Sequence, residues 1–225
     1  MKKITFLFLL FSSMLSAQEI VQELEDFSEV KVYNGLEVEL LAGSTNRAVI
    51  DGQSKEEVNI TSEDGVLKVK MRLDNIWKPD NTRIRIYYNE LQKLNVFQSS
   101  VVRLKDKIKQ QEFEFQVQEG SLIFANVDVQ ELNSGAFTGG EIDVEGKAVN
   151  QDITIRAGGK FYGGNLESEN VAIGISAGGV GDIKASNKVT AKVRAGGTVN
   201  VYGNPEVIDK QTLLGGKIIR KNQSF

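Results

Sequence analysis

The sequence contains no cysteine and no histidine, and only two prolines among its 225 residues. Without cysteine the chain can form no disulfide and can carry no lipid on an N-terminal cysteine. It also lacks the side chains needed for Ser-His-Asp and Cys-His catalysis and the usual ligands of zinc and iron–sulfur clusters. We therefore expect no metal and no cofactor, with stability coming from packing and from β-strand pairing.

Features of nucleic-acid binders are missing as well. The formal net charge is −3, and without Lys2 and Lys3 it becomes −5, whereas nucleic-acid affinity depends on basic side chains that neutralise phosphates. The one basic cluster, over 105–109, is interrupted by Asp106. The glycine-rich phrases lack the Gly-Lys-Ser/Thr ending of a phosphate-binding loop. These patterns exclude nucleic acid as an expected partner.

The N-terminus has the layout of a secretory signal peptide. A short positive region, residues 1–3, precedes an apolar run over 4–15, and Ser16-Ala17-Gln18 offers a small-residue cleavage point. We expect residues 1–17 to be removed. The run is too short for a comfortable membrane span, and no later stretch approaches the ~20 apolar residues of a transmembrane helix. The sequence thus predicts export to the periplasm, the outer surface or the medium. The alternative is a buried or anchoring N-terminal helix.

One short phrase occurs three times in the C-terminal half of the chain. Each copy alternates apolar and polar residues, stops at Ala-Gly-Gly and then resumes its alternation. The glycine pairs are about 20 and then about 18 residues apart, a period in the range of solenoid repeats. The copies are Ile-Thr-Ile-Arg-Ala-Gly-Gly (153–159), Ile-Gly-Ile-Ser-Ala-Gly-Gly (173–179) and Ala-Lys-Val-Arg-Ala-Gly-Gly (191–197).

The same period extends beyond these three copies. Small residues recur at 99–100, 120–121, 139–140 and 215–216, and a second turn region lies between successive pairs. Two strands and two turns per ~20 residues describe one coil of a parallel β-helix. Aligning the coils on the glycines places Ile155, Ile175 and Val193 in one inward column, with the alanine before each pair turning inward at a corner. The crossover rule favours right-handed coiling. The alternative is an antiparallel sandwich in which Gly-Gly marks hairpin turns.

We expect one β-helical domain over residues 18–225. Within it, 27–92 form an N-terminal strand-rich cap and 93–221 form the glycine-punctuated coils. The only tryptophan, Trp77, lies in a loop beside Pro79, where it is either an aromatic platform or a lid over the open end of the solenoid.

Three features of the sequence resemble a known family. They are the repeated Ala-Gly-Gly coils, the opening Phe-Ser-Glu-Val-Lys-Val (27–32) and the closing Val-Tyr-Gly-Asn-Pro (201–205). The sequence resembles the "putative auto-transporter adhesin, head GIN domain" family of Bacteroidetes, a domain of unknown function (DUF2807), over about Phe27 to Lys221. The resemblance implies a secreted, envelope-associated β-helical protein with an adhesin label, and it carries no catalytic signature.

Candidate site residues come from the outward columns of the coils. The column after the glycine pairs holds Asp143, Tyr162 and Asp182, and the column before them holds Arg156 and Arg194. Tyr162 is the best aromatic platform for a glycan, with the two arginines as hydrogen-bond donors. Asp143 and Asp182 are expected two coils apart, roughly 9–10 Å, a spacing that suits inverting glycoside hydrolysis. A solvated polar face without a ligand explains the same residues.

These observations support three hypotheses of function. The first is a non-enzymatic envelope protein that presents a β-helix face to a glycan or a cell-surface protein. The second is a polysaccharide lyase or hydrolase that uses the surface aspartates. The third is a structural spacer without a ligand of its own.

Overall fold

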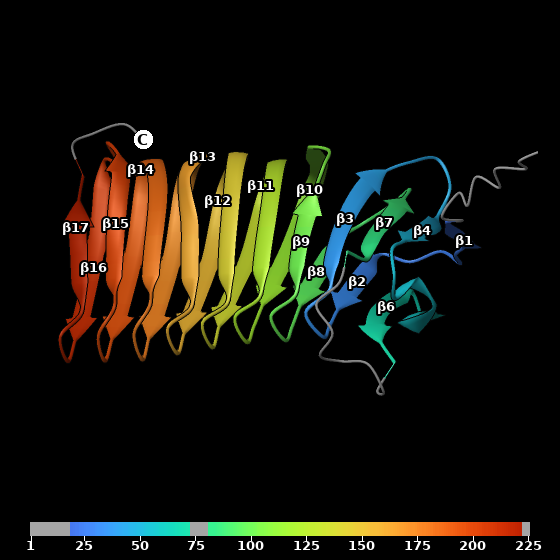
Figure 1. Ribbon diagram of the computed structural model, residues 1–225. Helices are drawn as coiled ribbons and strands as arrows, with labels where there is room; N and C mark the ends of the chain where they lie inside the picture. Colours follow the sequence, from blue (N-terminus) through green and yellow to red (C-terminus); the bar gives the residue numbers. More distant parts are fainter. Residues whose placement is uncertain (1–18, 73–80, 222–225) are drawn as a thin grey trace, which may run out of the picture.

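The molecule is an elongated β-solenoid, with the N-terminal end at the right of Figure 1 and the last coil at the left. The structure is a computed structural model that describes residues 19–72 and 81–221. The predicted signal peptide (1–17) and the loop that holds Trp77 lie outside the described residues. Among the described residues the only helical element is a 3-10 turn, η1 (Lys55–Glu57), and no helix is long and apolar enough to span a membrane.

Most of the solenoid consists of parallel strands stacked coil on coil. Each strand pairs with the one a coil later, which confirms the parallel β-helix and excludes the antiparallel sandwich for this region. The strands are β8 (Lys93–Val96), β9 (Val101–Leu104), β10 (Ile108–Val117), β11 (Leu122–Phe137), β12 (Glu141–Arg156), β13 (Lys160–Ser176), β14 (Val180–Arg194), β15 (Thr198–Gly203), β16 (Val207–Leu213) and β17 (Lys217–Arg220).

The long strands bend in the middle, and the burial pattern shows where. In β11 the buried positions are odd-numbered up to Val129 and even-numbered from Leu132, with Gln130 and Glu131 both exposed between them. Strand side chains alternate faces, so this change of phase turns the inward side around a corner. Each coil therefore has a tight turn at one edge, at the bottom of Figure 1, and a wide corner at the other.

The wide corner divides every coil into two halves. We call the outer surface of the half-strands that follow a tight turn the leading face, formed by 122–129, 141–148, 160–168, 180–185 and 198–203. The outer surface of the half-strands that precede the next turn is the trailing face, formed by 131–137, 150–156, 170–176, 188–194 and 207–213.

Aliphatic columns run through the interior, as the sequence predicts. Ile155 is paired with Ile175, and Ile175 with Val193, and all three are at most 2% exposed. Phe161 pairs with Ile142 and fills the interior from the leading half. Because like residues lie over like, each coil buries the apolar surface of its neighbour, and burial contributes roughly 25 cal/mol per Å² of apolar surface.

The expectation that the alanine before each glycine pair turns inward is wrong. Ala157 is exposed, and it and Gly158 both have positive φ, of 49° and 77°. The amide of Gly159 donates to the carbonyl of Arg156 at 3.2 Å, which completes a type I′ turn. Such a turn requires positive φ at both central residues, and this points the alanine side chain outward. Ala177 and Ala195 have the same conformation.

The wide corner carries a ladder of side-chain amides that the sequence analysis missed. Asn187 Nδ2 donates to Asn170 Oδ1 at 2.9 Å, and Asn170 Nδ2 donates to Asn150 Oδ1 at the same distance. Asn150 Nδ2 in turn donates to Glu131 Oε1 at 2.7 Å. The residues that the sequence assigns to a second turn region therefore bend the strands here, and the register shifts near Gly146 and Glu167 are irregularities within continuous strands.

The first coils are not stacked in chain order. The coil of β2 and β3 pairs on one side with β8 and β9, and on the other side with β6 and β7, which follow it in the sequence. Strands β1, β4 and β5 then pair antiparallel at this end. The proposed cap over 27–92 thus combines parallel coils with antiparallel strands. The strands are β1 (Ile20–Glu23), β2 (Glu29–Val32), β3 (Glu37–Ala42), β4 (Arg47–Asp51), β5 (Val58–Glu63), β6 (Val66–Met71) and β7 (Arg83–Tyr88).

Candidate functional site

Three of the predicted site residues form one continuous column on the leading face. Asp143 of β12 pairs with Tyr162 of β13, and Tyr162 pairs with Asp182 of β14. Neighbouring strands are ~4.8 Å apart, so the two aspartates lie roughly 9–10 Å from each other with the tyrosine between them. The expected register of these coils is therefore confirmed, while a binding role for the column remains a prediction.

The column continues beyond the predicted residues toward the N-terminal end. Phe124 of β11 pairs with Asp143, and Arg103 of β9 pairs with Phe124. The Arg103 guanidinium lies 4.1 Å from the centroid of the Phe124 ring, a cation–π contact that covers one face of this ring. Sequence reasoning missed Phe124, although Gly120-Ser121 had been recognised as one of the repeated turns.

The two aspartates have different surroundings. Asp182 is only 9% exposed, and it accepts a hydrogen bond from Asn200 Nδ2 at 2.7 Å. Asp143 is exposed, and its pKa is raised above the ordinary value, first by partial burial of the carboxylate and second by the nearby charge of Glu145. Asp143 is therefore the more accessible of the pair.

Hydrogen-bond acceptors gather beside Asp143. Asn126 Nδ2 donates to Glu145 Oε1 at 2.8 Å, while Asn126 Oδ1 is buried without a partner among the described residues. Buried polar atoms are normally hydrogen-bonded, so the unpaired Asn126 Oδ1 is an exception near the carboxylates of Asp143 and Glu145.

Tyr162 is held in position from its own strand. The Lys160 ammonium pairs with Glu141 and also donates to the Tyr162 hydroxyl. The hydrogen bond to Glu141 is the largest cause of the raised pKa of Lys160. The contact with the hydroxyl positions the Tyr162 side chain. Because the charge of Lys160 is already paired with Glu141, Lys160 is not a free cation for a ligand.

The predicted arginines lie on the other side of the wide corner. Arg156 and Arg194 belong to the trailing halves of β12 and β14, in a column where each pairs with Ser176 of β13. Arg156 lies 5.9 Å from the ring centroid of Phe137. The structure therefore separates both arginines from the face of Tyr162, where they were expected to act as donors.

Two hollows lie away from the leading column. One, of about 230 Å³, is on the trailing face and is lined by residues that include Gly135, Phe137 and Thr154. The other, of about 470 Å³, is at the wide corner and is lined by small residues such as Ala148, Ser168 and Ala185. Neither hollow was predicted from the sequence.

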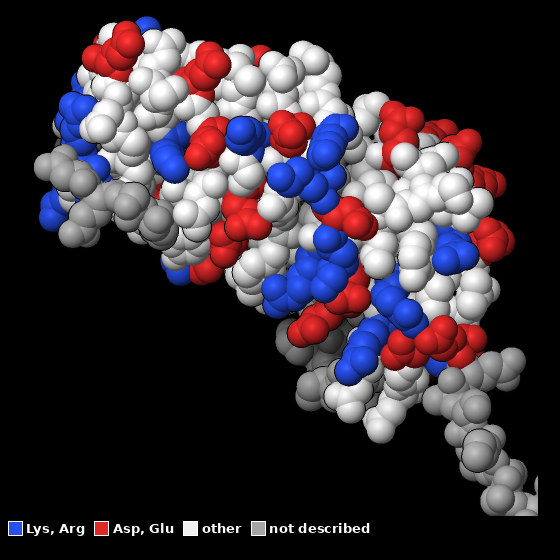
Figure 2. Space-filling model, turned by 90° about the horizontal axis from the view of Figure 1, so that it is seen from above, with Lys and Arg blue, Asp and Glu red and all other residues white. Residues whose placement is uncertain are grey.

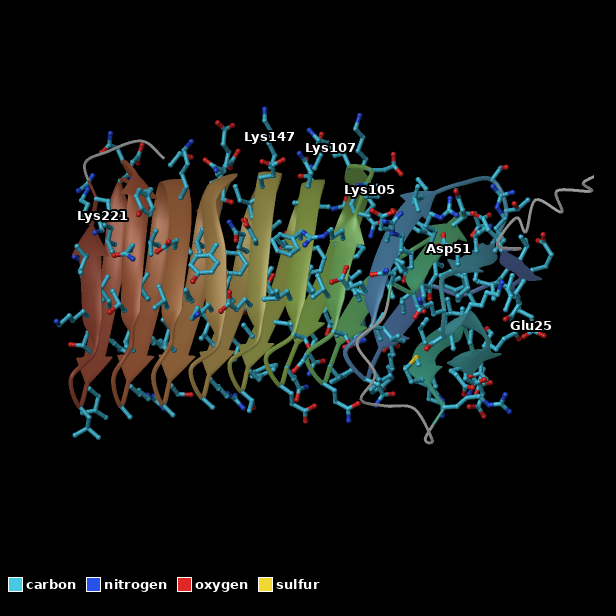
Figure 3. All side chains as sticks on the ribbon, in the orientation of Figure 1. Glu25, Asp51, Lys105, Lys107, Lys147 and Lys221 are labelled. Atoms are coloured by element: carbon cyan, nitrogen blue, oxygen red, sulfur yellow. The ribbon has the colours of Figure 1, made fainter. Side chains whose placement is uncertain are left out.

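Charges of both signs alternate over the wide corner. Along successive coils Asp128 pairs with Lys147, Lys147 with Glu167, and Glu167 with Lys184. Figure 2 shows Lys and Arg interspersed with Asp and Glu on this edge, and Figure 3 shows Lys147 projecting from it. Across residues 19–72 and 81–221, no group of three or more Asp and Glu side chains is arranged to hold a metal ion.

Comparison with known proteins gives one family and several solved structures. Residues 26–205 match the family described as "Putative auto-transporter adhesin, head GIN domain" (DUF2807). A putative adhesin from Bacteroides fragilis superposes with a TM-score of 0.81 at 16% identity, covering 92% of this chain and 98% of that one. No curated protein matches the chain.

Two further structures from Parabacteroides share the fold. A putative adhesin from Parabacteroides merdae has a TM-score of 0.67 at 17% identity, covering 91% of this chain and 96% of that one. A putative lipid binding protein from Parabacteroides distasonis has a TM-score of 0.68 at 14% identity, covering 92% and 98%. At these identities the likeness concerns the fold.

Proposed function

Because this chain belongs to the family described as "Putative auto-transporter adhesin, head GIN domain", we propose that it is an exported, non-enzymatic, adhesin-like protein of the cell envelope. It binds a glycan or a cell-surface protein through its leading face. The predicted signal peptide over residues 1–17 supports export to the periplasm, the outer surface or the medium.

The observation that carries the proposal is the column Phe124–Asp143–Tyr162. Two half-buried aromatic side chains flank an exposed carboxylate, in a register fixed by the backbone pairing of three consecutive coils. Aromatic rings offer large contact area at low conformational cost, and the carboxylate offers directional hydrogen bonds. A rigid scaffold of this kind loses little entropy on binding.

A polysaccharide-active enzyme is the second candidate, and the raised pKa of Asp143 favours it. A protonated Asp143 is a possible general acid, with Asp182 roughly 9–10 Å away as the second carboxylate. Two features oppose this role. Asp182 is almost buried and bound by Asn200, and the Tyr162 side chain stands between the two carboxylates.

A glycan array with the purified protein tests the proposal. We expect retained binding without turnover, and its loss in Tyr162→Ala. Degradation of a polysaccharide panel that disappears in Asp182→Asn would establish the enzyme instead. Null results for glycans, for envelope proteins and for turnover together would leave the third hypothesis, a structural spacer.

A further inference from the structure

Aromatic side chains recur on every second coil of the leading face. Phe124 lies on β11, Tyr162 on β13 and Tyr202 on β15, while the coils between them carry Asp143 and Asp182. Tyr202 pairs with Lys184 and lies one outward position further along its strand than Asn200, which pairs with Asp182. The repeat of this pattern is two coils, roughly 9–10 Å.

Of the two aspartates that lie between aromatic coils, Asp143 is the one that is accessible to a ligand. Asp143 is exposed, whereas Asp182 is almost buried. Phe124 and Tyr162 flank Asp143 on the neighbouring coils, and Asn126 and Glu145 add further acceptors. The strands of Phe124 and Tyr162 are separated by twice the strand spacing, roughly 9–10 Å, and Asp143 lies on the strand between them. We call these five residues the Asp143 site.

The charges of the leading face argue against an acidic ligand. Its two lysines near the aromatic column are already engaged, Lys160 by Glu141 and Lys184 by Glu167 at 3.7 Å. Asp143 and Glu145 have no such cationic partner among the described ion pairs. A ligand that donates hydrogen bonds and carries no negative charge satisfies these acceptors without repulsion.

A basic protein partner fits the geometry less well. The lysines that alternate with the acids along the face prevent a uniformly negative surface, which is what a cationic patch would require. The two-coil repeat of aromatic side chains instead matches a linear polymer whose repeating unit is about as long as a disaccharide.

We infer that the Asp143 site binds one sugar ring of an uncharged, linear polysaccharide lying along the solenoid axis, in a register of one disaccharide per two coils. The sugars over the two neighbouring coils pack against Phe124 and Tyr162, and the sugar between them donates hydroxyl hydrogens to Asp143. This inference rests on the proposed function, and it names the ligand class and the site.

Calorimetry with β-linked glucose, mannose and xylose oligosaccharides of increasing length tests it, with polygalacturonate fragments of matched length as the acidic probe. We expect binding of neutral oligosaccharides only, with an affinity that rises with length. Asp143→Asn and Tyr162→Ala each lower this affinity by about tenfold or more, because the first weakens the hydrogen bonds to a charged acceptor and the second removes an aromatic contact.

Matched variants separate the site from the fold. Asp152→Asn makes the same replacement on the trailing half of β12 and leaves the affinity unchanged, and Tyr162→Phe keeps the ring and most of the binding. Tighter binding of polygalacturonate, or displacement of the neutral glycan by an oligolysine peptide, would overturn the ligand class. Glycan binding unaffected by Asp143→Asn and Tyr162→Ala would overturn the site while leaving the proposed function standing. Capture of an envelope protein through Tyr162 without any glycan binding would overturn the ligand class and leave the proposed function standing.

Discussion

The α-carbon of Gly159 lies directly over the backbone of Ala136 in the preceding coil, so that a β-carbon added to Gly159 would be 2.2 Å from the Ala136 carbonyl oxygen. This contact explains the second glycine of the repeated phrase. In the coil of Gly159, a side chain at this residue would collide with the backbone of the preceding coil. In the earlier coils the position holds Ser100 and Ser121, and Ser121 Oγ accepts a hydrogen bond from the Ser100 amide.

Replacement of this glycine tests the stacking contact. Gly159→Ala forces backbone apart and is expected to lower the free energy of unfolding by about 1–3 kcal/mol. Gly174 is the control, because it lies in a strand with nothing within 4 Å of an added β-carbon. Gly174→Ala is expected to be neutral or to stabilise by about 0.4–1 kcal/mol, since the unfolded chain loses freedom. Urea denaturation of both variants measures the difference, and equal effects would contradict the proposed cause.

The buried pair Gln151 and Ser168 gives a second prediction. Gln151 Nε2 donates to Ser168 Oγ, and both residues are under 9% exposed, while Gln151 Oε1 is buried without a partner among the described residues. Ser168→Ala alone leaves the whole amide unpaired and destabilises the protein. The double variant, Gln151→Leu with Ser168→Ala, removes both polar groups. Its free energy of unfolding is expected to be about 1–3 kcal/mol higher than that of the wild type. Thermal and urea unfolding of the single and double variants check this order.

The ladder of side-chain amides at the wide corner gives a third prediction. Asn170→Ala removes the hydrogen bond donated to Asn150 and the one accepted from Asn187. We expect the free energy of unfolding to fall by about 1–2 kcal/mol, because partly exposed hydrogen bonds contribute modestly to stability. Asn165→Ala, at an exposed position of the same strand, serves as the comparison. An equal loss in the two variants would show that the ladder adds nothing.

The fourth prediction concerns pH. The folded-state pKa of Asp143 lies above its ordinary value because of burial and Glu145, so the ionised carboxylate destabilises the folded state. This cost is complete above the raised pKa and disappears as the pH falls through it to below the ordinary range of an aspartate. Asp143→Asn is therefore expected to be more stable than the wild type at neutral pH, with the advantage vanishing in acid. Urea midpoints across this range test the sign, and Asp152→Asn controls for the substitution. An advantage that grows as the pH falls would contradict the assignment.

Local periodicity was enough to predict the interior of the solenoid and the leading column. Glycine pairs set the register, and the alternation of side chains then placed Ile155 with Ile175 and Asp143 with Tyr162. The inward alanine was wrong because the turn type, which local alternation does not reveal, requires positive φ at Ala157.

The remaining differences come from long-range pairing. Nothing local indicates that β6 and β7 lie beyond β2 and β3. The sequence analysis predicted Arg156 beside Tyr162. It did not recognise that the alternation of buried residues changes phase within each long strand, which is where the wide corner lies. Without that corner, outward residues before and after a tight turn look as if they share a surface.

The most direct measurement is amide hydrogen exchange of the protein with and without a neutral oligosaccharide that binds it. Binding through the leading face predicts protection of residues 122–126, 141–145 and 160–164, with unchanged exchange in 131–137 and 150–156. Protection confined to the trailing halves, around Phe137 and Arg156, would contradict the account.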